Sequence, residues 1–232
     1  MKVNRNVGSE TGGSRTGGQT MRQAAYERIE ELLNTAQLAP GEIVTQRGLV
    51  ERTGATLAAV REAIPRLEAE GLLKTLPNRG LMVPSVDVRF VREAYRLRKL
   101  LEVSAVEDAI RLVPKPRIEA WIDEHETDLQ ADVPPGDKAL SERFQHLDWD
   151  LHQTIVQSMN NGLVDNIYRV NTIKIRMAVQ SRIQVTPLNI ARVAGEHLSF
   201  LRPMLAGDEA AAREALGLHI EKSMQIALGE TF

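Results

Sequence analysis

The sequence predicts a mainly α-helical protein built from two domains. Apolar residues recur at helical spacing over most of the chain, and Pro, Gly and Asn residues separate the helical segments. Only two short segments, 72–75 and 81–83, have the character of β-strands. With 232 residues, the chain is long enough for two domains that each bury a core. A hydrophobic content of 43% and a charged content of 26% are typical of a folded globular protein.

The N-terminal segment is expected to be a disordered tail. Residues 1–20 are rich in Gly, Ser, Thr and Arg and contain almost no large apolar side chain, so burial cannot offset the entropy of ordering them. We expect the first domain at 21–85 and the second at 86–232.

Three helices are expected to open the first domain. The first spans 21–35, where apolar residues recur at helical spacing. Thr45 is a suitable N-cap for a short second helix, which Gly54 would end, and Thr56 is a suitable N-cap for a third, which Gly71 would end. Two short helices joined by a tight turn that contains Gly are typical of a helix-turn-helix.

The two strand-like segments are expected to form a hairpin after the third helix. They flank a turn sequence, Pro77-Asn78-Arg79-Gly80. Such a hairpin directly after a helix-turn-helix is a wing. The first domain is therefore predicted to be a winged helix-turn-helix, a DNA-binding motif.

The second domain is predicted to be an all-helical bundle. Its segments are separated by Pro114 and Pro116, by Pro134-Pro135-Gly136, by Asn160-Asn161-Gly162, by Pro187 and by Gly207. The six expected helices lie near 87–111, 117–127, 138–159, 163–183, 189–206 and 208–228.

Composition excludes several classes of protein and of site. No apolar run approaches the roughly 18 residues of a membrane span, and the N-terminus lacks a secretory signal, so we expect a cytoplasmic protein with no membrane partner. The absence of cysteine leaves imidazole and carboxylate as the metal ligands. The net charge is −2, and residues 21–88 carry eight Lys or Arg against nine Asp or Glu, so any DNA contact depends on local clustering of cations.

Both predicted domains resemble known families. The first resembles the GntR superfamily of bacterial regulators in Pro40-Gly41, Arg47, Val60-Arg61-Glu62-Ala63, Leu67-Glu68-Ala69-Glu70-Gly71-Leu72 and Asn78-Arg79-Gly80. The helical remainder resembles the ligand-sensing FCD domain of the FadR-like branch, and a six-helix bundle is similar to its VanR-type subgroup. The resemblance implies a homodimeric transcriptional regulator, a repressor that a small carboxylate or aromatic-acid metabolite releases from double-stranded operator DNA.

The same resemblance assigns the DNA contacts to the second helix, the start of the third and the wing tip. The residues at these places are Arg47, Thr56, Arg61, Arg79 and Gly80. An arginine at the start of a recognition helix can bond two acceptors of guanine in the major groove. The alternative role for Arg61 is a surface ion pair with Glu62 or Glu68.

The chain departs from the family pattern in the third helix. Leu57-Ala58-Ala59 stands where the family usually carries polar residues that include a DNA contact, and Pro65 lies inside the helix. Proline removes one intrahelical hydrogen bond. We therefore expect an operator that differs from the commonest consensus of the family.

A metal site is predicted in the second domain. Asp148 and His152 lie four residues apart on one expected helix, so their side chains share a face. The FCD pattern adds two histidines from later helices, and His197 and His219 occupy the matching positions. Three imidazoles and one carboxylate suit zinc or nickel, with iron and manganese as further candidates.

The other histidines are expected to lie at the surface. His125 and His146 have no counterpart in the family pattern. A histidine considered alone is more often an exposed or hydrogen-bonded residue than a ligand, and the metal assignment therefore depends on the four residues together.

Two arginines are candidates for binding the effector. Arg98 and Glu102 lie four residues apart on the first helix of the bundle and resemble a family pair, and Arg176 is a second candidate. An inward-facing guanidinium beside a metal offers a fork for a carboxylate. The alternative for Arg98 is a structural ion pair with Glu102.

Two other functions are alternatives to a metal-binding, effector-controlled regulator. A metal-dependent hydrolase could use an open metal position to activate water, but the sequence has no His-Glu-x-x-His motif and no serine elbow, so we expect no enzyme. The second rival is a dimeric DNA-binding regulator that uses neither metal nor effector.

Overall fold

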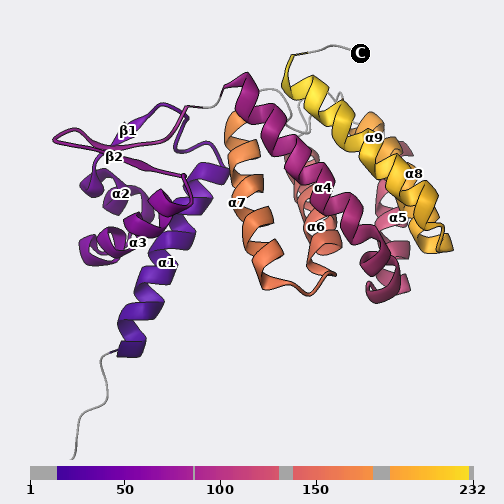
Figure 1. Cartoon of the computed structure of the whole chain (residues 1–232), viewed down its shortest axis with the longest axis horizontal. Helices are drawn as coiled ribbons and strands as arrows, with labels where there is room; N and C mark the ends of the chain where they lie inside the picture. Colours follow the sequence, from indigo (N-terminus) through magenta and orange to yellow (C-terminus); the bar gives the residue numbers. More distant parts are fainter. Residues whose placement is uncertain (1–14, 86, 131–137, 180–188, 230–232) are drawn as a thin grey trace, which may run out of the picture. The chain divides into compact units, whose positions relative to one another are not determined.

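The computed structural model describes residues 15–85, 87–130, 138–179 and 189–229. The chain divides into two compact units, 1–84 and 85–232 (Figure 1). The expected breaks at Pro134-Pro135-Gly136 and Pro187 lie outside the described residues. Within these ranges, no helix has the length and apolar character needed to cross a membrane.

The N-terminal unit contains three helices and a small antiparallel sheet. Its elements are α1 (Arg15–Asn34), β1 (Ile43–Val44), α2 (Gln46–Thr53), α3 (Leu57–Ala69), β2 (Lys74–Leu76) and β3 (Gly80–Met82). Helix α1 begins inside the segment that was predicted to be a disordered tail, and that prediction is wrong for residues 15–20. Residues 1–14 lie outside the described part of the chain.

The caps predicted for the helix-turn-helix are confirmed. The side chain of Thr45 accepts a hydrogen bond from the backbone N–H of Gly48 at 3.0 Å, which begins α2. Gly54 ends α2 in the left-handed conformation, with φ 65°. Thr56 accepts a hydrogen bond from the N–H of Ala59 at 3.2 Å, which begins α3.

The predicted wing is a sheet of three strands rather than a two-stranded hairpin. The strand order is β1-β3-β2, with both pairs antiparallel. Strand β1 was not predicted from the sequence. In the wing turn, Arg79 N–H donates to Leu76 C=O at 3.0 Å, and Asn78 has φ 60°. Gly80 is required because a Cβ there would lie 2.7 Å from the carbonyl oxygen of Val44.

Helices α1 and α3 form most of the core of the N-terminal unit. Apolar residues on one face of each helix are buried together with residues of the sheet, and α3 continues through Pro65. The buried set includes Ala25, Ile29, Leu33, Val60, Ala63, Ile64, Leu67, Leu72, Leu81 and Val83.

The C-terminal unit contains six helices in its described residues, which confirms the predicted bundle. They are α4 (Val88–Leu112), α5 (Lys115–Gln130), α6 (Lys138–Gln157), α7 (Gly162–Val179), α8 (Ile190–Ala206) and α9 (Glu209–Ala227). Helix α4 packs against α7 on one side and against α9 on the other (Figure 1). Pro116, expected in a break, lies in the first turn of α5, where a missing N–H removes no intrahelical bond.

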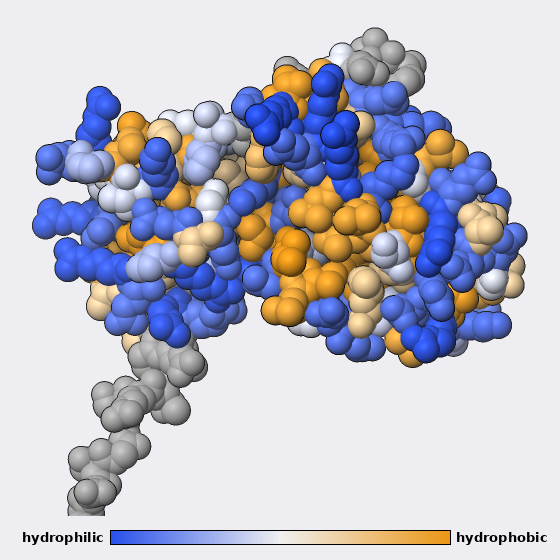
Figure 2. Space-filling model, viewed as in Figure 1, coloured by the Kyte–Doolittle hydropathy of each residue, from blue (hydrophilic) through white to orange (hydrophobic). Residues whose placement is uncertain are grey.

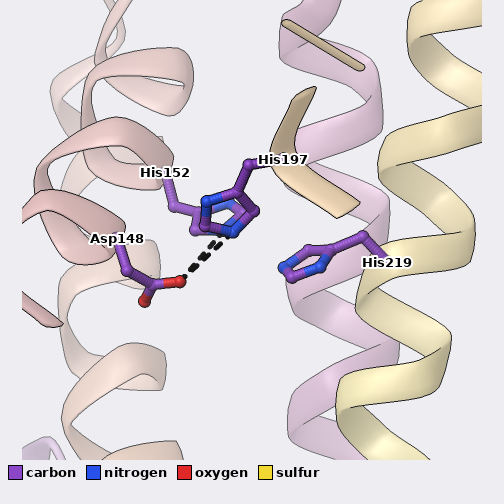
Figure 3. A group of neighbouring side chains, drawn as sticks. All are labelled: Asp148, His152, His197 and His219. Atoms are coloured by element: carbon purple, nitrogen blue, oxygen red, sulfur yellow. Dashed lines mark ion pairs between the residues drawn. The ribbon is translucent and has the colours of Figure 1, made fainter. Parts of the chain in front are cut away.

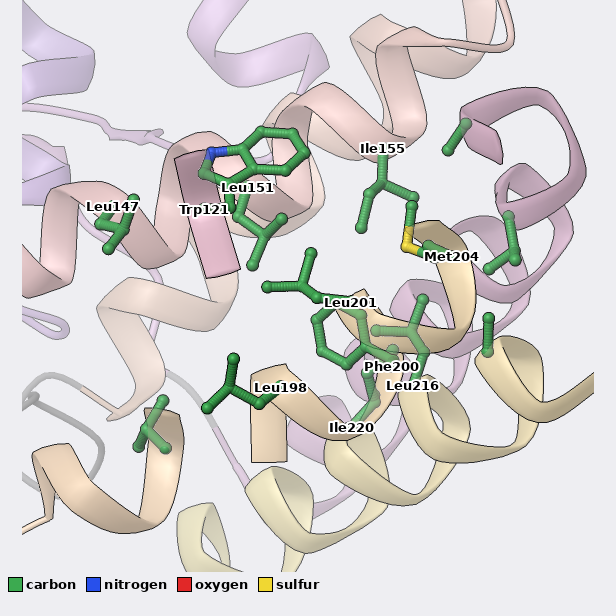
Figure 4. Packing of buried hydrophobic residues seen from close by; sticks show 14 of the residues in the cluster. Trp121, Leu147, Leu151, Ile155, Leu198, Phe200, Leu201, Met204, Leu216 and Ile220 are labelled. Atoms are coloured by element: carbon green, nitrogen blue, oxygen red, sulfur yellow. The ribbon is translucent and has the colours of Figure 1, made fainter. Parts of the chain in front are cut away.

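The core of this unit fixes α5, α6, α8 and α9 against one another. Large apolar side chains from the four helices pack together (Figure 4). They include Trp121, Leu147, Leu151, Ile155, Leu198, Phe200, Leu201, Met204, Leu216 and Ile220. Full burial of each such side chain stabilises the folded state by roughly 1.5–3 kcal/mol. Polar side chains on the same helices are therefore held in fixed positions.

Candidate metal centre and nucleic-acid interface

Four side chains from three helices converge in the C-terminal unit. Asp148 and His152 lie on α6, His197 on α8 and His219 on α9, and Figure 3 shows all four pointing toward one another. One potential ligand atom from each residue lies within 4.8 Å of the corresponding atoms of the others. The structure therefore brings together the four residues that the sequence predicted as metal ligands.

The carboxylate of Asp148 faces two of the imidazoles. Its Oδ1 lies 3.3 Å from His197 Nε2 and 3.8 Å from His152 Nε2 (Figure 3). The three histidines are buried, and the side chain of Asp148 keeps 17% of its exposure. Asp148 is thus the least buried member of the cluster.

A buried glutamate orients His152. His152 Nδ1 donates to Glu102 Oε2 at 2.6 Å, while Arg98 Nε and Tyr168 O–H donate to Glu102 Oε1 at 2.5 and 2.7 Å. Although burial opposes ionisation of Glu102, the charge of Arg98 and the hydrogen bonds from His152 and Arg98 outweigh it and lower the pKa to about 2. Because the ionised Glu102 can only accept, the proton of a neutral His152 sits on Nδ1 and leaves a lone pair on Nε2.

A second glutamate orients His219 in the same way. His219 Nδ1 donates to Glu196 Oε2 at 2.9 Å, and Arg192 donates to Glu196 Oε1 at 2.8 Å. Burial opposes ionisation of Glu196, but hydrogen bonds from His219 and Arg192 lower its pKa to about 2. Burial lowers the pKa of His219 to about 3, so His219 is neutral near pH 7 with its lone pair on Nε2.

The third imidazole, that of His197, is hydrogen-bonded to another histidine. His197 Nδ1 lies 2.8 Å from His125 Nε2, and His125 Nδ1 lies 2.6 Å from the carbonyl oxygen of Trp121. The prediction that His125 lies at the surface is wrong, because its side chain is fully buried. The apolar residues Ile118 and Trp121 place the same face of α5 inward, which is the signal that could have located it. The prediction that His146 is exposed is confirmed.

The converging atoms are all hydrogen-bond acceptors. His152 Nε2 and His197 Nε2 are buried and have no hydrogen-bond partner among the described residues. Burial lowers the pKa of His197, which favours its neutral form. Three lone pairs and a carboxylate in one buried place are unfavourable unless a cation is shared between them. The donor set therefore fits a divalent metal, and the second nitrogen of each histidine is held as metal sites require.

The two candidate effector residues have different surroundings. Arg98 forms the ion pair with Glu102 that was the structural alternative, and its side chain is 14% exposed. Glu102 in turn accepts a hydrogen bond from the candidate ligand His152, which links Arg98 to the candidate metal site. The guanidinium of Arg176 on α7 lies 3.7 Å from the centre of the ring of Trp149, the residue that follows Asp148, in a cation–π contact.

The candidate DNA contacts lie on α2, at the start of α3 and on the wing. Arg47, Arg61 and Arg79 are exposed, as is the N-cap Thr56, and Gly80 is half-buried at the start of β3. These are the positions at which the sequence placed them. The hydrogen bond of Arg61 Nε goes to Gln46 Oε1 at 2.9 Å, so the alternative ion pair with Glu62 or Glu68 is not what the structure contains.

The sequence matches two families, one in each unit. Residues 93–222, more than half of the chain, match the FCD domain, and residues 21–83 match the bacterial regulatory proteins of the gntR family. An uncharacterised HTH-type transcriptional regulator in an unstable DNA locus of Streptomyces ambofaciens is 30% identical over 152 residues. The match covers 65% of this chain and only 61% of that protein. The HTH-type transcriptional repressor RspR of Escherichia coli is 22% identical over 205 residues, which cover 88% of this chain and 87% of RspR.

Solved structures share the fold. Escherichia coli McbR/YncC superposes with a TM-score of 0.72 at 21% identity, covering 90% of this chain and 97% of the other. A putative GntR transcriptional regulator from Rhodococcus sp. RHA1 superposes with a TM-score of 0.71 at 16% identity, covering 92% and 100%. The matched families and relatives are transcriptional regulators, not enzymes. The chain belongs to the proteins that carry an FCD domain, and a helix-turn-helix domain of the gntR family precedes that domain.

Proposed function

We propose that the chain is a DNA-binding transcriptional repressor whose FCD domain holds a divalent metal and senses a small carboxylate there. The observation that carries this proposal is the convergence of Asp148, His152, His197 and His219, in which the buried Nε2 atoms of His152 and His197 have no hydrogen-bond partner among the described residues. The six helices in the described part of the bundle favour the VanR-type subgroup. A protein that reads chromosomal operators acts in the cytoplasm.

Zinc or nickel suits the donor set best, with iron and manganese as further candidates. Three imidazole nitrogens and one carboxylate oxygen are ligands that these metals accept, and they leave coordination positions for another ligand. When bound, such a metal supplies a Lewis acid that can coordinate a carboxylate oxygen. The protein contributes the orientation, because Glu102, His125 and Glu196 each hold one imidazole.

The charge balance of the site favours an anionic effector. A divalent metal with the single carboxylate of Asp148 keeps one formal positive charge. Glu102 is balanced by Arg98, and Glu196 is balanced by Arg192. A carboxylate would neutralise the remaining charge, and Arg98 adds a nearby guanidinium that can hydrogen-bond such a group. Arg176 stays a second candidate for this contact.

The effector part of the proposal is tested by titrating carboxylates into metal-loaded and chelator-stripped protein. The panel would contain acetate, malate, citrate and benzoate, with DNA binding followed by fluorescence anisotropy on an operator selected from random duplexes. We expect one or more acids to weaken DNA binding of the loaded protein only. An equal response of stripped protein would favour a regulator that works without a metal.

Arg61→Ala tests the DNA interface. Arg61 is exposed on the first turns of α3, where its guanidinium can reach a guanine, and Gln46 fixes its Nε. We expect a loss of about 1–3 kcal/mol in operator binding and relaxed preference at one base pair. Competition between operators that differ at single positions measures both effects.

Arg52→Ala is the matched control for Arg61→Ala. It removes one positive charge from the same unit. Arg52 lies in the last turn of α2, however, and its guanidinium is paired with Glu42. We expect it to leave base preference unchanged. An Arg61→Ala protein with unchanged preference would show that Arg61 reads no base.

A second copy of the chain is proposed to bind the face formed by α4 and α7. Apolar side chains gather over these two adjacent helices (Figure 2). Leu163 and Ile167 on α7 are 78% and 49% exposed, and Leu100 on α4 is 64% exposed. A contiguous apolar patch is typical of an interaction site. Because each chain has one helix-turn-helix, two-fold pairing through this face would supply the two DNA-binding domains that a palindromic operator needs.

A further inference from the structure

We propose that His125 is a positioning residue of the metal centre, which fixes the proton of His197 on Nδ1 and so keeps the Nε2 lone pair directed at the metal. This inference rests on the proposed metal site. His125 lies on α5, which supplies none of the four candidate ligands. Its contact with His197 joins residues that are 72 positions apart in the chain.

The directions of the two hydrogen bonds of His125 follow from its partners. The carbonyl oxygen of Trp121 can only accept, so the bond at 2.6 Å requires a proton on His125 Nδ1. In a neutral imidazole the other nitrogen is then an acceptor. His125 Nε2 must therefore accept from His197 Nδ1 at 2.8 Å, and His197 Nε2 is left without a proton.

The packing around His125 holds the ring on several sides. The side chain is fully buried, and its ring meets the edge of Phe144 with centroids 5.3 Å apart. It meets the ring of His197 at 4.9 Å. The backbone carbonyl of Trp121, inside α5, holds Nδ1 of His125, and this fixes the position of Nε2, which faces His197.

His125 differs from the other two orienting residues in charge. His152 and His219 are oriented by Glu102 and Glu196, and each glutamate is balanced by an arginine. A third carboxylate behind His197 would cancel the positive charge that the metal retains. A neutral histidine orients the ligand without that loss, which preserves the attraction for an anionic effector.

Two variants of the full chain separate positioning from bulk. His125→Phe keeps a ring beside Phe144 but removes the acceptor, whereas His125→Gln keeps an acceptor oxygen. His146→Phe, at an exposed position of α6, is the matched control. Circular dichroism checks that each variant folds.

The first measurement uses metal-free protein and nitrogen-15 NMR of the imidazoles, and the second uses zinc competition with a chromophoric chelator. We expect wild-type His197 to carry its proton on Nδ1 before metal is added, and His125→Phe to shift it toward Nε2. We expect His125→Phe to weaken zinc binding about 10- to 100-fold, His125→Gln to recover part of this loss, and His146→Phe to bind as wild type.

The outcomes distinguish this inference from the proposed metal site. Wild-type protein that binds no zinc but has the Nδ1 proton would refute the metal site and keep the orienting role of His125. If wild-type protein binds zinc but His197 carries its proton on Nε2 in the metal-free state, the inference about His125 is wrong. If His125→Phe does not fold, the wild-type spectrum and the zinc affinity of His125→Gln decide. A His125→Gln protein whose zinc affinity is less than one tenth of the wild-type value, although the tautomer of His197 is unchanged, contradicts the role of His125.

Discussion

We expect zinc to stabilise the FCD domain and Asp148→Asn to abolish this stabilisation. A metal that binds only the folded state, at 100 to 1,000 times its dissociation constant, stabilises it by about 3–4 kcal/mol. For a domain of this size, that corresponds to a rise of roughly 10 °C in the unfolding temperature. Asp148 supplies the only carboxylate of the cluster, so its loss removes one ligand and the charge that attracts the cation. Calorimetry of the full chain with and without zinc measures the difference.

The same variant makes a prediction of opposite sign without metal. The amide that replaces the carboxylate can donate a hydrogen bond to His197 Nε2, which lies 3.3 Å from Asp148 Oδ1. D148N protein should therefore be at least as stable as wild type when both are stripped of metal. His146→Ala, an exposed change on the same helix, should keep the full effect of zinc. A zinc-dependent rise that persists in D148N would exclude Asp148 as a ligand.

We expect the protein to form a dimer, and Ile167→Asp combined with Leu163→Asp to make it monomeric. Both side chains lie exposed on α7, and pairing would bury two new carboxylates per chain without partners. Because a dimer holds two half-sites at once, we expect operator affinity to fall about 100- to 10,000-fold. Affinity for an isolated half-site should not change. Sedimentation velocity at micromolar concentration and anisotropy on both DNA fragments measure these effects.

Leu218→Asp serves as the matched control for the α7 face. Leu218 is about half exposed on α9, a helix that packs on α4 away from α7. We expect this variant to stay dimeric and to bind the operator as wild type. If Leu218→Asp dissociates the dimer while the α7 variant does not, the proposed face is wrong.

Local signals in the sequence were sufficient for most of the fold. Thr45, Gly54 and Thr56 mark helix ends because capping depends on residues within three positions of each other. Strand β1 was missed because a strand of two residues has no measurable period. Ile43 and Val44 become a strand only by pairing with Met82 and Leu81, which lie far along the chain.

The candidate ligands were predictable and most of their hydrogen-bond partners were not. The spacing of four residues between Asp148 and His152 predicts that their side chains share a helix face, and the resemblance to the FCD pattern identified His197 and His219. Glu196 and His125 act through contacts between helices, and no local pattern encodes such contacts. The ion pair that was the structural alternative for Arg98 is present, and Glu102 links it to the candidate ligand His152.

The metal content of the purified protein decides whether Asp148, His152, His197 and His219 form a metal site. Wild-type protein, His152→Ala and His197→Ala would each be incubated with zinc, nickel or manganese, dialysed, and analysed by mass spectrometry, followed by effector titration. We expect about one ion per wild-type chain, and a loss of both metal and effector response in the two variants while DNA binding largely survives. Wild-type protein that stays free of all three metals, yet responds normally to the effector, would contradict the account.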